Sequence, residues 1–292
     1  MTAAVAPSAA VAPRWKLLRR PTERVTRGAV ADYAAIVLLA AVTAIALLAP
    51  VLAPYDPVQP IGTPKLTPLS PGHLLGTDSI GRDVLSRVLL GLRTSWLLSI
   101  VVTATGLVIG TIIGLVAGMF GGWVDALLMR ITEVFLALPS MLVAVAVAAA
   151  LGPGLANTFL AVSIVWWPYY ARIIRSETRA LATRPHVEAA RLSGVGWFRI
   201  MWRHLLPGTI PTAIISASLD IGNVVLVLSS LSFLGLGQPA PAPELGSDTS
   251  SSLTEILNAW WIPLTYGTVV MALSLISNLA GDAIRNRLAV SR

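Results

Sequence analysis

The sequence contains no cysteine and only three histidines. Without cysteine the chain forms no disulfide, no thiolate nucleophile and no cysteine-ligated metal site. His73, His186 and His204 are not spaced as a metal-ligand pair, and no glycine-rich loop ends in Gly-Lys-Ser/Thr to hold nucleotide phosphates. The sequence therefore offers no enzyme constellation, and we expect this chain to bind no cofactor or metal of its own.

Charged residues are also scarce. They make up 12% of the 292 residues, against roughly a quarter in ordinary soluble domains. Apolar residues reach 55% and the mean hydropathy is +0.76, so there are too few charges to cover a soluble surface. The net charge of +7 lies beside apolar runs rather than on a face interleaved with aromatics. The composition indicates a protein of the lipid bilayer with no nucleic-acid partner.

Six apolar stretches are long enough to cross a membrane. A spanning helix needs about 20 mostly apolar residues, because the hydrocarbon core is about 30 Å thick. The stretches are Ala34 to Ala53, Thr94 to Phe120, Ile131 to Leu151, Leu155 to Ile174, Ile210 to Leu234 and Ile262 to Ala280. The sequence thus predicts an all-α, polytopic membrane protein with six transmembrane helices.

The first stretch has an alternative interpretation as a cleaved secretory signal, since small residues follow it. The 33 residues that precede it are basic and longer than a usual signal leader, which favours a retained helix. If it is retained, six crossings place both termini on the same side of the membrane.

Lysine and arginine indicate which side that is. Most of the 21 cations lie in residues 1–33, in residues 171–207 and in the last residues of the chain, all on one side of a six-span arrangement. By the positive-inside rule that side is the cytoplasm. The predicted organisation is a cytoplasmic segment 1–33, a first helix 34–53, an extracytoplasmic segment 54–93, a five-helix core 94–285 with a cytoplasmic loop 175–207 and an extracytoplasmic loop 235–261, and a cytoplasmic tail 286–292.

Several residues inside the predicted spans call for close packing or polar contacts. Glycines recur every fourth residue from Gly106 to Gly118, which favours close helix packing within the chain over a pore-lining or dimer face. Asp220 and Asn223 interrupt an apolar run; Asp220 either lines a polar pathway or bonds to a neighbouring helix. For Glu133, pairing with Arg130 at the membrane edge is the favoured interpretation.

The stretch Glu188 to Pro207 reads EAARLSGVGWFRIMWRHLLP and separates two of the spans. Pro185 suits the first turn of a helix, Glu188 complements the positive helix end, and Gly194 is placed to stop the helix. These signals predict a short exposed helix of about two and a half turns. A simple solvated connector is the alternative.

The spacing within this stretch resembles the EAA loop in permease subunits of bacterial ABC importers. The family pattern is EAA, three residues, glycine, nine residues, then I-x-L-P. Here Glu188, Ala189, Ala190 and Gly194 match it, as do Leu206 and Pro207, whereas His204 occupies the isoleucine position. The resemblance implies that these six matching residues contact an ATPase subunit.

Further motifs resemble the dipeptide/oligopeptide permease C-type subunits. In chain order they are Leu75-Gly76-Thr77-Asp78 with Gly81 to Arg87, Gly121-Gly122 with Asp125, Leu231 to Gly237, and Trp260-Trp261. The resemblance implies a type I ABC importer permease fold in the bacterial inner (plasma) membrane. It also implies partners: a second permease subunit, two ATPase subunits or a fused pair that bind ATP and magnesium, and an extracytoplasmic substrate-binding protein.

Two departures concern the transport pathway. Relatives often carry a glutamate shortly before the Leu231 to Gly237 motif, where this chain has Leu228, and Leu245 stands where an aromatic is usual. Asp220 and Asn223 are therefore the pathway candidates.

Peptide import is the expected function; import of nickel chelates, glutathione or another small solute is the alternative within the family. A stand-alone channel or ion-driven carrier is the alternative from another class. The segment Gly76 to Arg87 either docks the binding protein or forms an amphipathic helix on the membrane.

Overall fold

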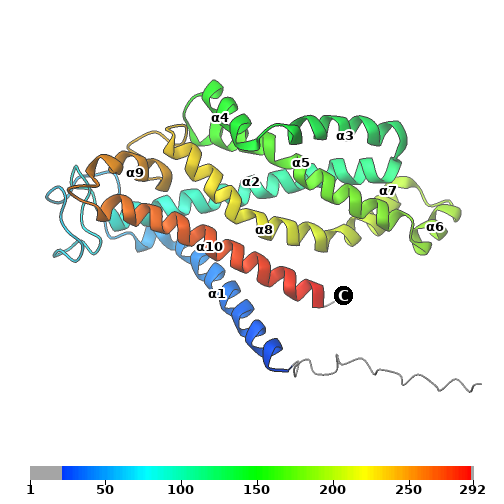
Figure 1. Ribbon diagram of the computed structural model, residues 1–292, viewed down its shortest axis with the longest axis horizontal. Helices are drawn as coiled ribbons and strands as arrows, with labels where there is room; N and C mark the ends of the chain where they lie inside the picture. The colour runs from blue at the N-terminus through cyan, green and yellow to red at the C-terminus, as the bar shows by residue number, and fades with distance from the viewer. Residues whose placement is uncertain (1–21, 291–292) are drawn as a thin grey trace, which may run out of the picture.

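The computed structural model describes residues 22–290, and side chains from residue 30 to residue 288. This part of the chain is built from helices and connecting loops (Figure 1). The long helices are α1 (Thr22–Leu52), α2 (Val84–Phe120), α3 (Gly122–Ala137), α4 (Ser140–Leu151), α5 (Leu155–Ala182), α8 (Leu206–Phe233) and α10 (Trp261–Val290). The short ones are α6 (Pro185–Leu192), α7 (Trp197–Ile200), the π-helical turn Met201–Leu205, α9 (Leu245–Ser252) and the 3₁₀ turn Leu253–Glu255. The predicted segment 1–33 lies largely outside the described residues.

Four helical stretches are long and apolar enough to cross a membrane, and a bent pair of helices raises the number to five. The four are Val30–Leu52, Val84–Phe120, Trp197–Phe233 and Trp261–Leu288. The remaining predicted span lies in α5, which has 28 residues but is less apolar, because polar Asn157 and the run Trp166 to Tyr170 interrupt it. The all-α polytopic fold is confirmed, and the count of six crossings stays a prediction.

The predicted span Ile131 to Leu151 is not one continuous helix. It is divided between α3 and α4, which meet at an angle of 87°. Pro139 explains the break, because a proline disfavours the helical conformation in the residue before it. Leu138 is accordingly extended, with φ −94° and ψ 142°.

The closest helix pairing joins α2 to α5 along the glycine series. A Cβ on Gly110 would lie 2.5 Å from Cβ of Tyr170 and 2.7 Å from the carbonyl oxygen of Trp167. A Cβ on Gly114 would lie 2.7 Å from the carbonyl oxygen of Ala171. Only glycine permits backbones to approach this closely. The prediction of close packing within the chain is confirmed.

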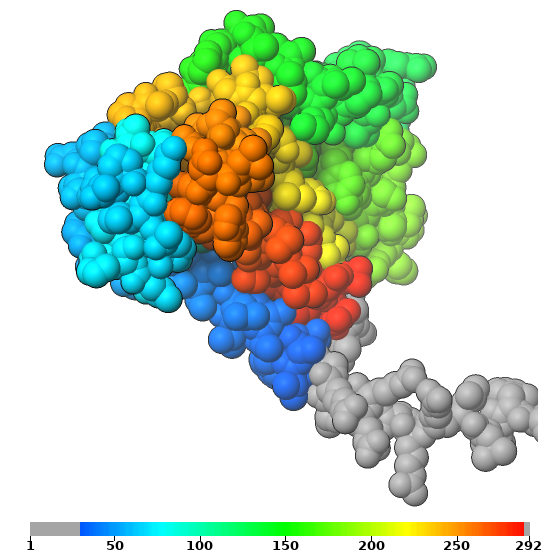
Figure 2. Space-filling view, turned by 60° about the vertical axis from the view of Figure 1, so that its left-hand side comes forward, coloured from blue at the N-terminus to red at the C-terminus, as the bar shows by residue number. Residues whose placement is uncertain are grey.

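The connections gather at two ends of the molecule. The long loop between α1 and α2 lies at one end with α9, whereas α6, α7 and the carboxyl end of α10 lie toward the other (Figure 1). The space-filling view shows the α1–α2 loop beside α9 (Figure 2). This separation matches the two faces predicted from the charge distribution.

The segment Gly76 to Asp83 is a loop, and α2 begins only at Val84. Gly76 and Gly81 have φ of 76° and 87°, a region that favours glycine. Asp83 caps α2, since its carboxylate accepts a hydrogen bond of 2.8 Å from the backbone N–H of Ser86. Val84 and Val88 are buried in the protein. The alternative of an amphipathic helix on the membrane surface is therefore wrong for this segment.

Candidate functional site

The predicted exposed helix is α6, which spans just over two turns and follows Arg184. Pro185 occupies its first turn, as the sequence predicts. Val187 is fully buried and anchors one face of α6 in a cluster with Ile174 of α5 and Leu205. Glu188 and Ala189 are exposed on the other side and Ala190 is half-buried. The helix therefore presents the first two residues of the EAA triplet to its surroundings while Val187 fixes it to the protein.

Gly194 ends α6 in the way the sequence predicts, with φ 76°. Its N–H donates to the carbonyl of Arg191 at 3.0 Å, and the N–H of Val195 donates to the carbonyl of Ala190 at 3.1 Å. This pair of bonds is a Schellman motif, which needs a left-handed residue at the position of Gly194. A Cβ on Gly194 would meet open space, so the need for glycine here comes from the backbone alone.

The second half of the EAA loop is helical and not irregular. Residues Trp197–Phe233 form one helical run that contains α7, a π-helical turn and α8. Leu206 and Pro207 lie at the start of α8, and His204 lies in the π-helical turn. A wider turn is a usual response to a proline inside a helix, whose ring displaces the preceding backbone. Helices α5 and α7 thus extend into the predicted loop 175–207, and residues 183–196, which include α6, connect them.

Large apolar side chains are exposed at the end of α6 and in the helical turns that follow it. Leu192 is 86% exposed, and Trp197, Phe198 and Trp202 are each more than half exposed. Exposed tryptophan and phenylalanine are typical of interaction surfaces and of membrane interfaces. These four residues were not predicted as functional from the sequence, although aromatics within a charged segment were a visible signal.

Asp220 turns toward α5. Its carboxylate accepts a hydrogen bond from Nε1 of Trp166 and another from the hydroxyl of Tyr170, the latter at 2.8 Å. The Asp220 side chain is almost fully buried, whereas Asn223, one turn along α8, is exposed. Of the two interpretations of Asp220, the structure contains the bond to a neighbouring helix. Asn223 is the pathway candidate that faces outward.

A second polar cluster lies near the α2–α3 junction, where the sequence analysis named Asp125. Its carboxylate binds the guanidinium of Arg175 through both oxygens and that of Arg179 at 3.0 Å. Glu133 pairs with Arg130 at 3.7 Å, with both side chains well exposed, so the predicted pairing is confirmed. The Asp125 cluster links α3 to α5, whereas the Glu133–Arg130 pair lies within α3.

At the opposite end, Arg87 of α2 is buried against α9. Its Nη2 donates to Oδ1 of Asp248 at 2.5 Å, and its Nη1 donates to the carbonyls of Pro57 and Pro241 at 2.7 and 3.2 Å. Burial raises the pKa of Asp248, while the charge and hydrogen bond of Arg87 oppose that rise. Arg87 belongs to a motif visible in the sequence, but its partner Asp248 was not predictable, because 161 residues separate the two.

Glu244 holds the turn that follows the Leu231 to Gly237 motif. Its carboxylate accepts hydrogen bonds from the hydroxyl of Ser232 and, at 2.7 Å, from the N–H of Gln238. Burial raises the pKa of Glu244, and these two bonds oppose the rise. A buried acid at the start of α9 thus fixes the motif through Ser232 and the residue that follows the motif, Gln238.

The fold and these sites define a helical membrane protein with a short exposed helix at one end. Among the described residues no group of three His, Asp or Glu side chains is arranged to hold a metal ion. The chain belongs to the family described as "binding-protein-dependent transport system inner membrane component", whose model matches residues 110–290.

Individual proteins extend the match. The chain is 38% identical over 243 residues to the probable D,D-dipeptide transport system permease protein DdpC of Escherichia coli K12, covering 83% of this chain and 81% of that protein. It is also 38% identical over 260 residues to the nickel transport system permease protein NikC of the same strain, covering 87% and 92%. A solved chain of the MetNI methionine ABC transporter superposes with a TM-score of 0.56 at 20% identity, covering 69% of this chain and 96% of that one. This last likeness shows the importer permease fold.

Proposed function

We propose that this permease subunit imports dipeptides or oligopeptides and receives the work of ATP hydrolysis through α6. The observation that carries the proposal is the geometry of the EAA loop. A short helix is fixed on one side by Val187, ended by Gly194, and exposed at Glu188 and Ala189. A rigid helix of this kind moves as a unit when a groove that holds it moves.

The proposed partners follow from what the chain lacks and from what it exposes. The sequence holds no nucleotide-binding motif, so ATP and magnesium would bind on separate ATPase subunits or a fused pair. The exposed Leu192, Trp197 and Phe198 beside α6 give such a subunit an apolar surface to cover. A second permease subunit would complete the pathway, and a substrate-binding protein would dock at the end that carries α9 and the α1–α2 loop.

The orientation of the subunit in the membrane is part of the proposal. The face carrying α6 would lie in the cytoplasm, together with both termini, because the cations concentrate there. Leu192→Cys and Leu257→Cys test this cleanly, since the chain has no native cysteine and these positions are 86% and 92% exposed. In intact cells a membrane-impermeant maleimide should label the Leu257→Cys variant and leave the Leu192→Cys variant unlabelled until the cells are opened. The reverse pattern would refute the orientation.

Peptide import is favoured because the similarity to the D,D-dipeptide permease is strong and covers most of both chains. The similarities to a nickel permease and to a glutathione permease are comparable, so a metal chelate or glutathione is the alternative substrate. Reconstitution with ATPase subunits and a binding protein from the same organism would separate them. Uptake of labelled dialanine into ATP-loaded proteoliposomes is expected, and uptake of a nickel chelate alone would contradict the peptide assignment.

The same proteoliposomes test the alternative that the protein is a stand-alone channel or an ion-driven carrier. A channel or ion-driven carrier would move solute through the purified chain without ATPase subunits. An importer subunit would be inactive until the ATPase subunits and ATP are supplied.

A further inference from the structure

Arg93 is the last charged residue of α2, since residues 94–120 carry no charge. Those residues are numerous enough to cross a bilayer, so Arg93 lies at the edge of the span. Its side chain is half-buried, and in the described part of the chain it has neither a hydrogen-bond partner nor an ion-pair partner. Arg87, earlier on the same helix, has both. A cation beside hydrocarbon is costly unless a counter-charge meets it, so Arg93 is suited to bind an anion from outside the chain.

Arg93 lines a hollow on the surface between α2, the start of α5 and the turn that follows α8. The volume of this hollow is about 600 Å³, within the range of small-molecule sites. The lining residues are Arg93, Thr94, Leu97, Leu98 and Val101 of α2, Leu155, Ala156 and Phe159 of α5, and Gln238. Arg93 is the only charged residue among them, so the hollow favours an occupant with a negative charge.

Gln238 is held in the wall of the hollow by its backbone. Its N–H donates to the carboxylate of Glu244 at 2.7 Å. Two residues earlier, the carbonyl of Leu236 accepts a hydrogen bond of 2.9 Å from the hydroxyl of Thr158 in α5. The turn is therefore fixed against α5, while the side-chain amide of Gln238 has no partner among the described residues. Arg93 and Gln238 thus supply N–H donors that nothing else in the described chain uses.

The apolar part of the wall leads away from the membrane edge. Leu97 and Val101 lie on the same face of α2 as Arg93, about 6 and 12 Å further along the helix axis. Val101 is 49% exposed, so its side chain is open to a neighbouring molecule. A cation at the edge of the span with an apolar wall leading inward matches an anionic phospholipid, whose phosphate lies at the interface and whose acyl chains lie in the hydrocarbon.

A transported peptide fits this hollow less well. A free dipeptide carries an ammonium as well as a carboxylate, and no aspartate or glutamate lines the hollow to meet the ammonium. Phosphatidylglycerol carries one negative charge and no positive charge. Its phosphate oxygens accept paired hydrogen bonds from a guanidinium, as a carboxylate does. The charge of the wall therefore favours the anionic lipid.

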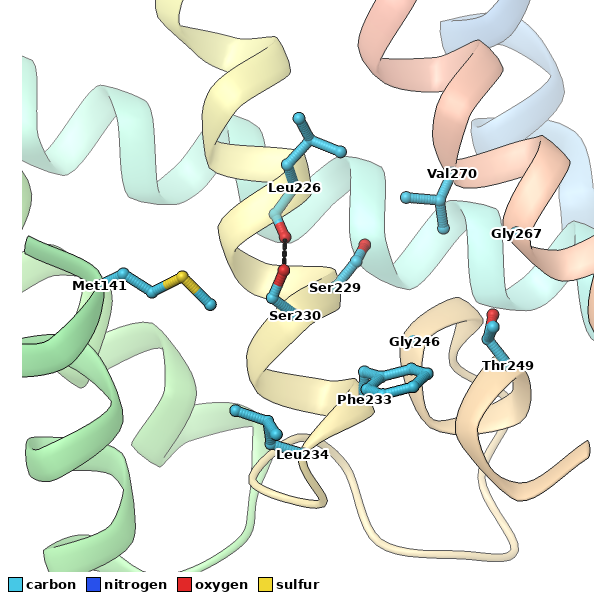
Figure 3. Close-up of a pocket in the computed structure, with 10 residues that line it drawn as sticks. All are labelled: Met141, Leu226, Ser229, Ser230, Phe233, Leu234, Gly246, Thr249, Gly267 and Val270. Carbon is cyan, nitrogen blue, oxygen red and sulfur yellow. Dashed lines mark hydrogen bonds between the residues drawn. The ribbon is translucent and has the colours of Figure 1, made fainter. Parts of the chain in front are cut away.

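A second hollow, where α4, α8, α9 and α10 meet, lacks these features (Figure 3). Its volume is about 380 Å³, and no charged residue lines it. The hydroxyl of Ser230 in its wall donates to the carbonyl of Leu226 on the same helix at 2.7 Å. This hollow offers no cation to a phosphate, so it is an internal reference for lipid binding at Arg93.

We propose that the hollow lined by Arg93 binds one anionic phospholipid, with its phosphate at Arg93 and an acyl chain along Leu97 and Val101. The amide of Gln238 donates a further hydrogen bond to the headgroup. A lipid held there contacts α2, α5 and the turn after α8 together, so its binding stabilises this end of the permease. Such binding requires only that the chain lies in a bilayer, whatever solute it transports.

The first test locates the lipid in the assembled importer. Photoreactive phosphatidylglycerol, with a diazirine in its acyl chain, should label the residues around Val101 and Phe159, as peptide mass spectrometry can show. Photoreactive phosphatidylcholine should label them about tenfold less, and Arg93→Gln should lower the phosphatidylglycerol labelling to that level. Labelling of the reference hollow around Leu226 should be the same for both lipids and unchanged in Arg93→Gln. Equal labelling around Val101 by the two lipids would overturn the proposal. A second permease subunit that covers the hollow would keep both lipids from labelling it, and that result would overturn the proposal as well.

The second test measures affinity through stability. Phosphatidylglycerol added to the detergent-purified importer should raise its melting temperature, and the concentration that gives half of the rise should be about tenfold higher for Arg93→Gln. The variant should fold and assemble, because no described residue loses a partner with Arg93. Arg93→Lys should keep part of the affinity, since it keeps the charge but not the paired donors. Arg130→Gln removes a cation whose side chain is 83% exposed and should respond like the wild type. The same half-rise concentration for Arg93→Gln and the wild type would refute the site.

Discussion

Arg87 and Asp248 join the first residues of α2 to α9 through a buried ion pair 2.5 Å long. The two side chains are 2% and 7% exposed. Arg87 also donates to two backbone carbonyls, of Pro57 and Pro241, so one guanidinium ties together α2, α9 and the loops before each of them. One buried cation thus joins four segments at the end of the molecule proposed to meet the binding protein.

Replacing that cation should destabilise the protein strongly. Arg87→Met leaves Asp248 buried and unpaired, which should lower the free energy of unfolding by about 3–5 kcal/mol. Adding Asp248→Leu should restore most of the loss, because the second change removes the unpaired charge. Thermal unfolding of the purified protein measures both. Arg130→Met is the control: its pair with Glu133 is exposed and 3.7 Å long, so less than about 1 kcal/mol should be lost. Equal losses for Arg87→Met and Arg130→Met would contradict the prediction.

Close packing of α2 on α5 gives a second prediction. Gly110→Val places a Cβ 2.5 Å from Cβ of Tyr170 and pushes against the backbone of Trp167. Neither helix can yield locally, so the cost should be about 3 kcal/mol or more. The yield of monodisperse protein in size-exclusion chromatography should fall sharply. Ile112→Val, at a position of α2 that is 59% exposed, should elute like the wild type. A normal yield of Gly110→Val would show that the two helices separate easily.

The sequence predicted the features that depend on local signals. Composition and apolar runs predicted a helical membrane protein, and the spacing from Gly106 to Gly118 predicted a close helix contact. The short helix α6 and its end at Gly194 were also predictable, because proline and glycine act on the backbone next to them.

The features that the sequence did not predict depend on distant residues. Arg87 and Asp248 are 161 residues apart, and nothing local to either shows the pairing. Asp220 and Asn223 lie one helical turn apart, so the sequence could not tell that Asp220 would turn to α5 and Asn223 would stay exposed. Pro139 was visible, but whether a proline kinks a span or divides it at 87° depends on the packing of both halves.

Asp220 gives a third prediction. Asp220→Leu is close in size and removes Oδ2, the one oxygen that accepts from both Nε1 of Trp166 and the hydroxyl of Tyr170. Two buried donors then lose their acceptor, and the free energy of unfolding should fall by about 1–3 kcal/mol for each of them. The melting temperature and yield should drop, while the preference among peptides in proteoliposomes stays the same. Changed preference at normal stability would assign Asp220 to the pathway. The control Ile214→Val, at an exposed position on the same helix, should leave stability unchanged.

The fourth prediction concerns Gly194 and the transmission of force through α6. Gly194 has φ 76°, a conformation that costs a residue with a Cβ about 1 kcal/mol or more and costs valine more than most. Gly194→Val should therefore break the Schellman motif and change the direction in which the chain leaves α6. Gly196→Val is a matched control two residues away, because Gly196 has φ −61° and open space around its Cβ position. Both variants should insert in the membrane, since neither glycine lies within an apolar span.

Gly194→Val and Gly196→Val should differ in how well the permease is coupled to its ATPase subunits. With Gly194→Val, less ATPase subunit should co-purify with the permease, and stimulation of ATP hydrolysis by loaded binding protein should be lost. Basal hydrolysis should persist, because the nucleotide sites lie on another chain. Gly196→Val should behave as the wild type, and Gly194→Asn should recover much of the coupling, since asparagine tolerates the left-handed conformation. Glu188→Arg, which reverses the exposed charge on α6, should weaken co-purification without changing the helix. If Gly194→Val and Glu188→Arg both retain wild-type co-purification and stimulation, α6 is a solvated connector and transmits nothing.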